Sequence, residues 1–371
     1  MALSSVVAFM TAGIGTDRHA RAPAHLRVDG RVFRSEHGRF EWRGISAFRL
    51  VEMVARRREG EAIAFLDWAS KQELTVVRVF VMARHLFSLT AAEGLAALPR
   101  LLELANARGL HVEVVAFADT AQIRTDLDVH LKAVAAIAAR HPNAILEIAN
   151  EPGHATQDVR LHNPAFVKRL AALVPEPVPI ALGSAEYSAE YASGDYVTYH
   201  FPRKTGWGHV FDLARGAALI EHWRKPVVSD EPIGAAAKTV DGRRDSDPRH
   251  FRGAAALTRL TGMGATFHYE GGLQARIPSG RELECFVAWR AGLGMVDGLP
   301  EDGAFLEGSA VGAIGDVSGA GAAFARVFEL ENEAWLLLLD TSPRVSVGWK
   351  QGWSETGRNT GDGVALLRAR R

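Results

Sequence analysis

The chain alternates short apolar runs rich in β-branched residues with longer stretches in which apolar residues recur at helical spacing. This alternation is typical of βαβ units that build a parallel sheet. Strands are expected at residues 41–48, 75–82, 111–117, 144–150, 178–182, 196–201, 226–229 and 265–269. Helices are expected at residues 62–71, 91–108, 127–140, 164–174, 210–224, 248–261 and 281–293. We interpret the rhythm as a whole as eight strands and eight helices, although the helix after the fifth strand has no range of its own.

Such a series of βα units predicts an α/β fold, a closed (β/α)8 TIM barrel, which we place at residues 26–295. The alternative is an open, doubly wound sheet. Neither the Gly-rich dinucleotide-binding pattern nor the P-loop pattern follows any of the expected strands, which disfavours the nucleotide-binding form of that alternative.

Three segments at the two ends of the chain complete the expected organisation. At the start of the expected barrel, residues 26–40 read as a hairpin with Asp29-Gly30 at the turn, which we expect to plug the bottom of the barrel. Residues 1–25 form an apolar leader without a basic residue before Arg18, either disordered or a vestigial export signal. Residues 296–371 are expected to form a small β-rich appendage packed on the barrel, with strands at 324–330, 334–339 and 345–349.

The amino-acid composition limits the kinds of partner that we expect for this chain. The 371 residues include 43 basic and 43 acidic side chains, so no net charge favours a nucleic acid or an anionic membrane as partner. A neutral polar substrate such as a sugar fits this balance. The single cysteine, Cys285, cannot form an internal disulfide. The sequence leaves localisation, whether cytoplasmic or secreted, and oligomeric state open.

Active sites of such barrels lie at the carboxyl ends of the strands, which defines the mouth of the barrel. Polar residues at these expected ends are Arg78, Arg84, Asp119, Asn150, Glu151, His200, Asp230, Glu231, His268 and Glu270. Glu151 and Glu231 follow the fourth and seventh strands and should face each other across the mouth. Two carboxyls about 5–5.5 Å apart are what a retaining glycosidase needs, one as proton donor and one as nucleophile.

The stretch HPNAILEIANEPG at 141–153 resembles the fourth strand of clan A glycoside hydrolases, family 5 (cellulase- and mannanase-like) above all. TVVRVF at 75–80 and KPVVSDEP at 225–232 are similar to the second-strand and seventh-strand motifs, and the resemblance spans roughly residues 26–295. It implies a retaining mechanism with Glu151 as acid/base, Glu231 as nucleophile, Asn150 on the sugar 2-hydroxyl and Arg78 orienting Glu231. It also implies a carbohydrate substrate and neither a cofactor nor a metal.

The sequence departs from the family pattern in three places. No histidine ends the third strand, where Asp119 stands instead. The sixth-strand His-x-Tyr, whose Tyr contacts the nucleophile, is here His200-Phe201-Pro202, and Tyr199 should point to the other face of the strand. The eighth strand ends in FHYE rather than in a Trp that forms a sugar platform. These gaps leave the substrate class open.

Several expectations carry a structural alternative. Arg78 lies in an apolar strand and should pair either with Glu231 or with an interior acid such as Glu147. Supporting or substrate-binding positions are His200, His268, Glu270 and Trp207, whose ring could stack on a sugar. One rival function is a catalytically weak or inactive glycan-binding barrel. Another is a metal-dependent enzyme with Asp119, Glu151, His200, Glu231 and His268 as ligands.

Overall fold

The computed structural model describes residues 23–121 and 123–371, so nearly all of the expected leader lies outside the described residues. The described chain begins with a small antiparallel sheet of β1 (Arg27–Asp29), β2 (Val32–Ser35) and β3 (Gly38–Phe40). Its first turn is the predicted one. Gly30 has a φ of 57°, a left-handed conformation in which glycine meets no steric penalty.

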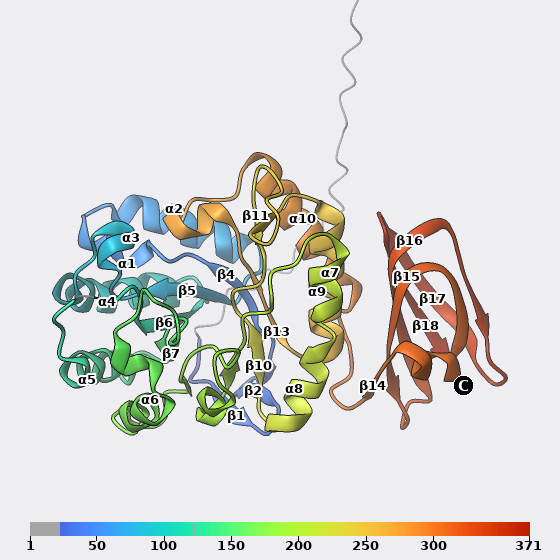
Figure 1. Ribbon diagram of the computed structural model, residues 1–371, viewed down its shortest axis with the longest axis horizontal. Helices are drawn as coiled ribbons and strands as arrows, with labels where there is room; N and C mark the ends of the chain where they lie inside the picture. Colours follow the sequence, from blue (N-terminus) through green and yellow to red (C-terminus); the bar gives the residue numbers. More distant parts are fainter. Residues whose placement is uncertain (1–22, 122) are drawn as a thin grey trace, which may run out of the picture.

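Eight parallel strands form the predicted barrel (Figure 1). They are β4 (Arg43–Ser46), β5 (Val76–Phe80), β6 (His111–Phe117), β7 (Ala144–Ala149), β8 (Ile180–Ala181), β9 (Val197–Thr198), β10 (Val227–Ser229) and β13 (Gly264–Phe267). Between β8 and β9 the ring is completed by loop hydrogen bonds, because the amide of Asp195 donates to the carbonyl of Ile180 at 2.7 Å. Every residue of β5, β6 and β7 is buried, as expected for strands covered on both faces.

Helices surround these strands. They are α1 (Leu50–Ala55), α2 (Glu59–Lys71), α3 (Arg84–Phe87), α4 (Ala91–Asn106), α5 (Leu127–Ala138), α6 (Pro164–Ala171), α7 (Trp207–Asp212), α8 (Arg215–Trp223), α9 (Pro248–Thr261) and α10 (Gly280–Met295). The prediction of a helix after every strand is wrong at one place. Residues 182–196, all of which the structure describes, hold only a short 3-10 turn, Ala189–Ser193. This segment is rich in Gly and Ser and has no long apolar periodicity, so it cannot support an amphipathic helix.

The hairpin closes the bottom of the barrel, as expected. Phe33 packs on Trp42 and Tyr196, with ring centroids 5.3 Å apart in both pairs. Trp42 precedes β4 and Tyr196 precedes β9, so this apolar cluster lies at the amino ends of the strands, opposite the mouth. The two ends of the barrel therefore differ in chemistry.

A five-stranded antiparallel sheet follows the barrel. Its strands are β14 (Ala304–Glu307), β15 (Gly315–Phe328), β16 (Glu333–Trp349), β17 (Ser354–Gly361) and β18 (Val364–Arg370). The separate strands expected at 334–339 and 345–349 are one long strand, β16, which pairs with β15 across a bulge near Gly319. Phe324, Leu337 and Leu339 share an apolar cluster with Leu257 and Leu260 of α9, and Figure 1 shows the sheet beside this helix.

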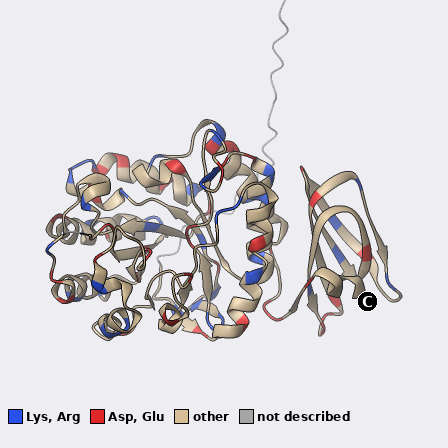
Figure 2. Ribbon diagram, viewed as in Figure 1, with Lys and Arg blue, Asp and Glu red and all other residues tan. Residues whose placement is uncertain are grey.

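Charged residues of both signs are mixed over this ribbon (Figure 2). None of the described helices combines the length and the apolar character needed to cross a membrane.

Buried histidines make stability dependent on pH. Burial lowers the pKa of His111 and of His130 to about 4, whereas the unfolded side chains titrate at their ordinary value of 6.5. The unfolded chain then binds more protons between these values, so the free energy of unfolding should fall as pH falls from 6.5 to 4. Urea denaturation at pH 7 and pH 5 measures this. His130→Gln should reduce the pH slope, and an unchanged slope in that variant would contradict the explanation.

Candidate active site

Arg78 is the centre of the polar cluster at the mouth. It projects from β5, is fully buried, and its guanidinium contacts carboxylates from three other strands. Its Nε and Nη2 donate to Glu147 Oε2 at 3.0 and 2.7 Å, and its Nη1 donates to Glu231 Oε2 at 3.0 Å. Asp230 lies 3.3 Å away and Glu113 3.6 Å away. The sequence analysis gave Glu231 and Glu147 as alternative partners of Arg78, and both ion pairs are present.

The single positive charge of Arg78 cannot neutralise four buried carboxylates. The pKa values of Glu113 and Glu147 are therefore raised, whereas that of Glu231 is lowered. Burial and the charge of Glu147 raise the pKa of Glu113 well above its usual range. Burial raises the pKa of Glu147 to about 7 in spite of Arg78. Burial opposes ionisation of Glu231 as well, but the facing charges of His200, Arg78 and Arg203 hold its pKa well below normal. Glu231 is thus ionised at neutral pH, as a nucleophile must be.

His200 lies between the two candidate catalytic carboxyls. Its Nδ1 is 3.6 Å from Glu151 Oε1 and its Nε2 is 3.8 Å from Glu231 Oε2. The ring nitrogens of an imidazole are about 2.2 Å apart, so these oxygens lie within about 10 Å of each other, a range that includes the spacing of retaining and of inverting glycosidases. Burial lowers the pKa of His200, but Asp230, 3.4 Å from Nε2, and the neighbouring glutamates raise it well above normal overall.

Asn150 and Glu151 occupy the turn that follows β7. The Asn150 Oδ1 accepts a hydrogen bond from Arg78 Nη2 at 2.7 Å, which leaves the amide NH2 free to donate to a ligand. Glu151 has a φ of 42°, a left-handed backbone conformation that a residue with a side chain rarely adopts. Its side chain is 23% exposed, whereas that of Glu231 is 9% exposed. Glu151 is therefore the carboxyl with better access to solvent.

His268 completes the cluster from the end of β13. Its Nδ1 lies 2.9 Å from Ser46 Oγ and its Nε2 lies 3.8 Å from Glu231 Oε1. Burial lowers the pKa of His268 to about 3, so the ring is neutral at pH 7 and can donate one hydrogen bond towards Glu231.

The other residues singled out from the sequence lie elsewhere. Trp207 begins α7 and packs between Gly253 of α9 and Gly363 of the C-terminal sheet, rather than standing free to stack on a sugar. Glu270 is exposed in the 3-10 turn after β13. Asp119 accepts backbone hydrogen bonds from His85 and Leu86 at 2.6 and 2.8 Å, so its carboxylate caps α3.

Two further residues named in the sequence analysis, Tyr199 and Arg84, lie outside the polar cluster. Tyr199 points away from the mouth, as expected, and its hydroxyl accepts a bond from Arg215 of α8 at 3.3 Å. Arg84 is exposed at the start of α3.

Four further residues reach the site from segments between the barrel strands. Glu186 and Tyr187 follow β8, and Glu186 offers an oxygen close to Glu151 and His200. Burial of its carboxyl, reinforced by the charge of Glu151, raises the pKa of Glu186 to about 7. Arg203 follows β9, and Arg244 lies on β12 (Arg244–Asp245). Active-site residues lie at the carboxyl ends of the barrel strands, so the position of Glu186 and Tyr187 after the fifth strand could have identified them from the sequence. No local sequence pattern identifies Arg203 or Arg244.

In residues 23–121 and 123–371, three groups of side chains have the spacing to hold a metal ion. They are His209, Asp245 and His250; Glu151, Glu186 and His200; and Glu113, Glu147 and Asp230. The five-ligand set considered from the sequence is not among them, because Asp119 caps a helix. The last group already surrounds Arg78, whose positive charge occupies the place that an ion would need.

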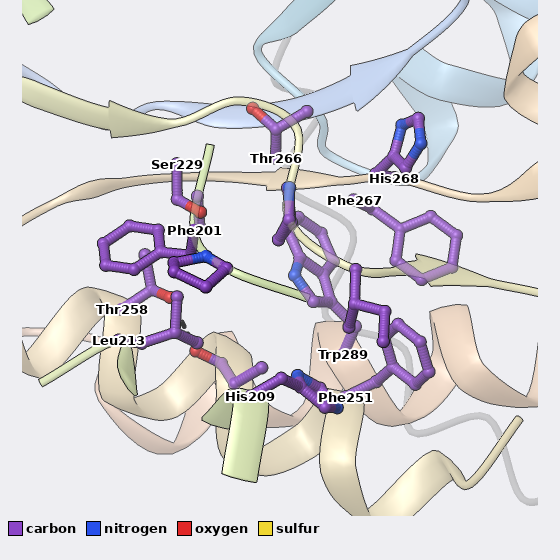
Figure 3. Close-up of a pocket in the computed structure, with 15 residues that line it drawn as sticks. Phe201, His209, Leu213, Ser229, Phe251, Thr258, Thr266, Phe267, His268 and Trp289 are labelled. Atoms are coloured by element: carbon purple, nitrogen blue, oxygen red, sulfur yellow. Dashed lines mark hydrogen bonds between the residues drawn. The ribbon is translucent and has the colours of Figure 1, made fainter. Parts of the chain in front are cut away.

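A small cavity lies behind the site, between the strands β10 and β13 and the helices α7 and α9 (Figure 3). Its walls are mostly apolar and include Phe201, Phe251 and Trp289. Neither Glu151 nor Glu231 lines it. The cavity lies in the wall of the barrel, and His268 of the polar cluster borders it.

Comparison with known proteins gives a match at the level of structure. No family model and no curated protein matches the sequence. A glycoside hydrolase of family 5 from Bacteroides vulgatus ATCC 8482 superposes with a TM-score of 0.63 at 14% identity, covering 93% of each chain. The fold is that of the family 5 glycoside hydrolases.

Other solved structures agree with this family 5 fold. A putative glycoside hydrolase from the same Bacteroides strain has a TM-score of 0.59 at 14% identity and covers 96% of this chain and 83% of that one. A β-glucanase from Saccharophagus degradans in complex with cellotetraose has a TM-score of 0.56 at 11% identity and covers 75% of this chain and 95% of that one. The two Bacteroides matches are long enough to include the C-terminal sheet.

Proposed function

We propose that this chain is a retaining glycoside hydrolase with Glu231 as nucleophile and Glu151 as acid/base. One observation carries the proposal: Arg78 and His200 both contact Glu231, and His200 also contacts Glu151. This arrangement keeps one carboxylate ionised and places the second beside it. The proposal extends to a single catalytic barrel at 26–295, with the leader 1–25 and the appendage 296–371 outside the chemistry.

In the first step, Glu231 Oε attacks the anomeric carbon while the bond from that carbon to the leaving oxygen breaks. Glu151 transfers its proton to the leaving oxygen, so the aglycone departs as a neutral alcohol. The product is a glycosyl ester on Glu231. The free amide nitrogen of Asn150 is placed to bind the 2-hydroxyl, a contact that strengthens as positive charge develops on the sugar.

In the second step, Glu151 accepts a proton from water, and the resulting hydroxyl oxygen attacks the anomeric carbon. The ester bond breaks, Glu231 regains its charge, and the sugar leaves with the configuration of the substrate. The surrounding cations, Arg78 and His200, stabilise the carboxylate that is released. No cofactor is needed for either step, and we expect activity to survive exhaustive chelation.

Replacing Glu151 should separate the two steps. Glu151→Ala should retain the first step for aryl glycosides with good leaving groups, because these need no proton, and should then accumulate the glycosyl-enzyme. Added azide should restore turnover and give a glycosyl azide of retained configuration, measured by NMR. An azide product of inverted configuration would show that the two roles are exchanged.

The rival reading is a barrel that binds glycans without turnover. Its specific support is the loss of a sixth-strand Tyr and an eighth-strand Trp, since Pro202 and Glu270 stand near those places. A panel of chromogenic glycosides and polysaccharides, with the product configuration followed by NMR, distinguishes the two. Glycan binding with no hydrolysis would favour the rival, and an inverted product would contradict the retaining mechanism.

A further inference from the structure

Arg203 and Arg244, here called the arginine pair, lie on the Glu231 side of the mouth and have no part in the two steps above. Arg203 Nη2 is 3.5 Å from Glu231 Oε1, and the Arg203 side chain is 32% exposed. It therefore reaches from the nucleophile towards the open part of the mouth. Glu231 also has an ion pair with the buried Arg78, so Arg203 is not the only cation that keeps this carboxylate ionised.

Arg244 reaches the same place from another loop. A Cβ on Gly234 would lie 3.4 Å from Arg244 Cδ and 2.9 Å from the His268 ring, which places Arg244 beside His268. His268 in turn lies 3.8 Å from Glu231 Oε1. The loop that carries Arg244 also meets the Arg203 loop, because the Arg203 carbonyl is 3.7 Å from the Cβ position of Gly242.

A rigid anchor holds Arg244 in this position. The next residue, Asp245, accepts hydrogen bonds from His209 Nε2 at 2.8 Å and from His250 Nδ1 at 2.7 Å, and all three side chains are buried. The strand is also paired, since β12 lies parallel to β11 (Gly234–Ala235). The fold thus holds the backbone at Arg244 in place, and the Arg244 side chain starts from this fixed point.

The charge of Arg244 is poorly compensated. Within the part of the chain that the structure describes, no carboxylate lies within ion-pairing distance of its guanidinium, and its Nη1 donates only to the Arg243 carbonyl at 2.9 Å. Burial and the charge of Arg203 lower the pKa of Arg244, while the charges of Glu270 and Glu231 act in the opposite direction. A partly buried guanidinium beside a second one is unfavourable unless an anion joins them.

We propose that the substrate carries an anionic group, a carboxylate of a uronic acid or a sulfate ester, which the arginine pair binds next to Glu231. The planar guanidinium fork fits both groups and binds each through paired hydrogen bonds. The opposite side of the mouth carries Glu186 beside Glu151, so the anionic group belongs on the Glu231 side. This inference deepens the proposed function, since it assumes that the same mouth binds the sugar.

Binding can be measured without turnover. Calorimetry on Glu151→Gln protein should compare oligosaccharides containing glucuronic or galacturonic acid, sulfated oligosaccharides, and the neutral cellotetraose and mannotetraose. We expect at least one acidic probe to bind about tenfold or more tightly than every neutral one, and to bind more weakly as salt rises. The identity of that probe distinguishes a carboxylate from a sulfate.

Variants assign the effect to the arginine pair. Arg244→Gln and Arg203→Gln should each reduce the ratio of acidic to neutral affinity by about tenfold, as expected for loss of charge-assisted hydrogen bonds. Arg243→Gln, the neighbouring exposed arginine, is the matched control and should leave the ratio unchanged. Circular dichroism and thermal melting verify that each variant is folded.

The outcomes separate this inference from the proposed function. If no acidic probe binds better than the neutral ones, or if the ratio is the same in Arg244→Gln, the inference is wrong even when neutral glycosides are hydrolysed. If acidic probes bind through the arginine pair but no glycoside is cleaved, the inference stands and the proposed catalysis fails.

Discussion

Glu231→Ala should lower kcat by about 10⁴-fold or more on every substrate, because loss of the nucleophile removes the covalent step itself. Leaving-group ability should not rescue it, in contrast to Glu151→Ala. Azide should occupy the vacated space and attack the anomeric carbon directly, giving a glycosyl azide of inverted configuration. The rate and the product configuration, followed on an activated aryl glycoside, check both statements.

The matched control is Glu190→Ala, which makes the same change to an exposed carboxylate in the loop after β8. It should leave kcat within about twofold of the unmodified protein, as is usual for surface substitutions. Wild-type activity in Glu231→Ala, or an azide product of retained configuration, would refute the assignment of the nucleophile.

Arg78→Leu should lower the free energy of unfolding by about 3–5 kcal/mol at pH 7, because it leaves buried carboxylates without their counter-ion. Glu147 and Glu231 lose direct ion pairs with Arg78, and Asp230 and Glu113 lose a nearby positive charge. Urea denaturation measures the loss. Arg84→Leu, at an exposed position in α3, should change the free energy of unfolding by less than about 0.5 kcal/mol.

The pH dependence of Arg78→Leu gives a second check. Without the guanidinium, the already raised pKa values of Glu113 and Glu147 rise further and the pKa of Glu231 rises as well, so the folded state binds protons more readily. The stability deficit of the variant should therefore shrink as pH falls from 7 to 5. Combining Arg78→Leu with Glu147→Gln should recover part of the loss. A deficit that stays constant with pH would mean that lost packing, not charge, explains it.

The barrel strands could be predicted from the sequence because each is a short apolar run buried on both faces. β6 begins and ends at the predicted residues, and β5 and β7 differ by only a few. The helix count failed between β8 and β9, where a polar, Gly-rich segment covers the barrel without helical periodicity. The division of residues 334–349 into two strands failed because Pro343 and its polar neighbours resemble a turn, whereas the bulged pairing with β15 accommodates them.

At the mouth, the residues in or directly after strands could be predicted from the sequence. The structure brings together Arg78, Asn150, Glu151, His200, Glu231 and His268. Arg203 and Arg244 were missed because their positions depend on how two loops meet in space. The interpretation of Trp207 as a residue that stacks on a sugar failed for another reason. A Trp in a loop after a strand can face a ligand or the protein, and here Gly253 and Gly363 provide a slot for it.

The left-handed backbone of Glu151 has a consequence for how this chain can change over time. A residue with a side chain in that conformation costs on the order of 1–3 kcal/mol, which glycine at the same place would not. Selection for stability alone would thus favour glycine at position 151 and remove the proposed acid/base. A chain that keeps glutamate there retains a local instability at a position where activity and stability demand different residues.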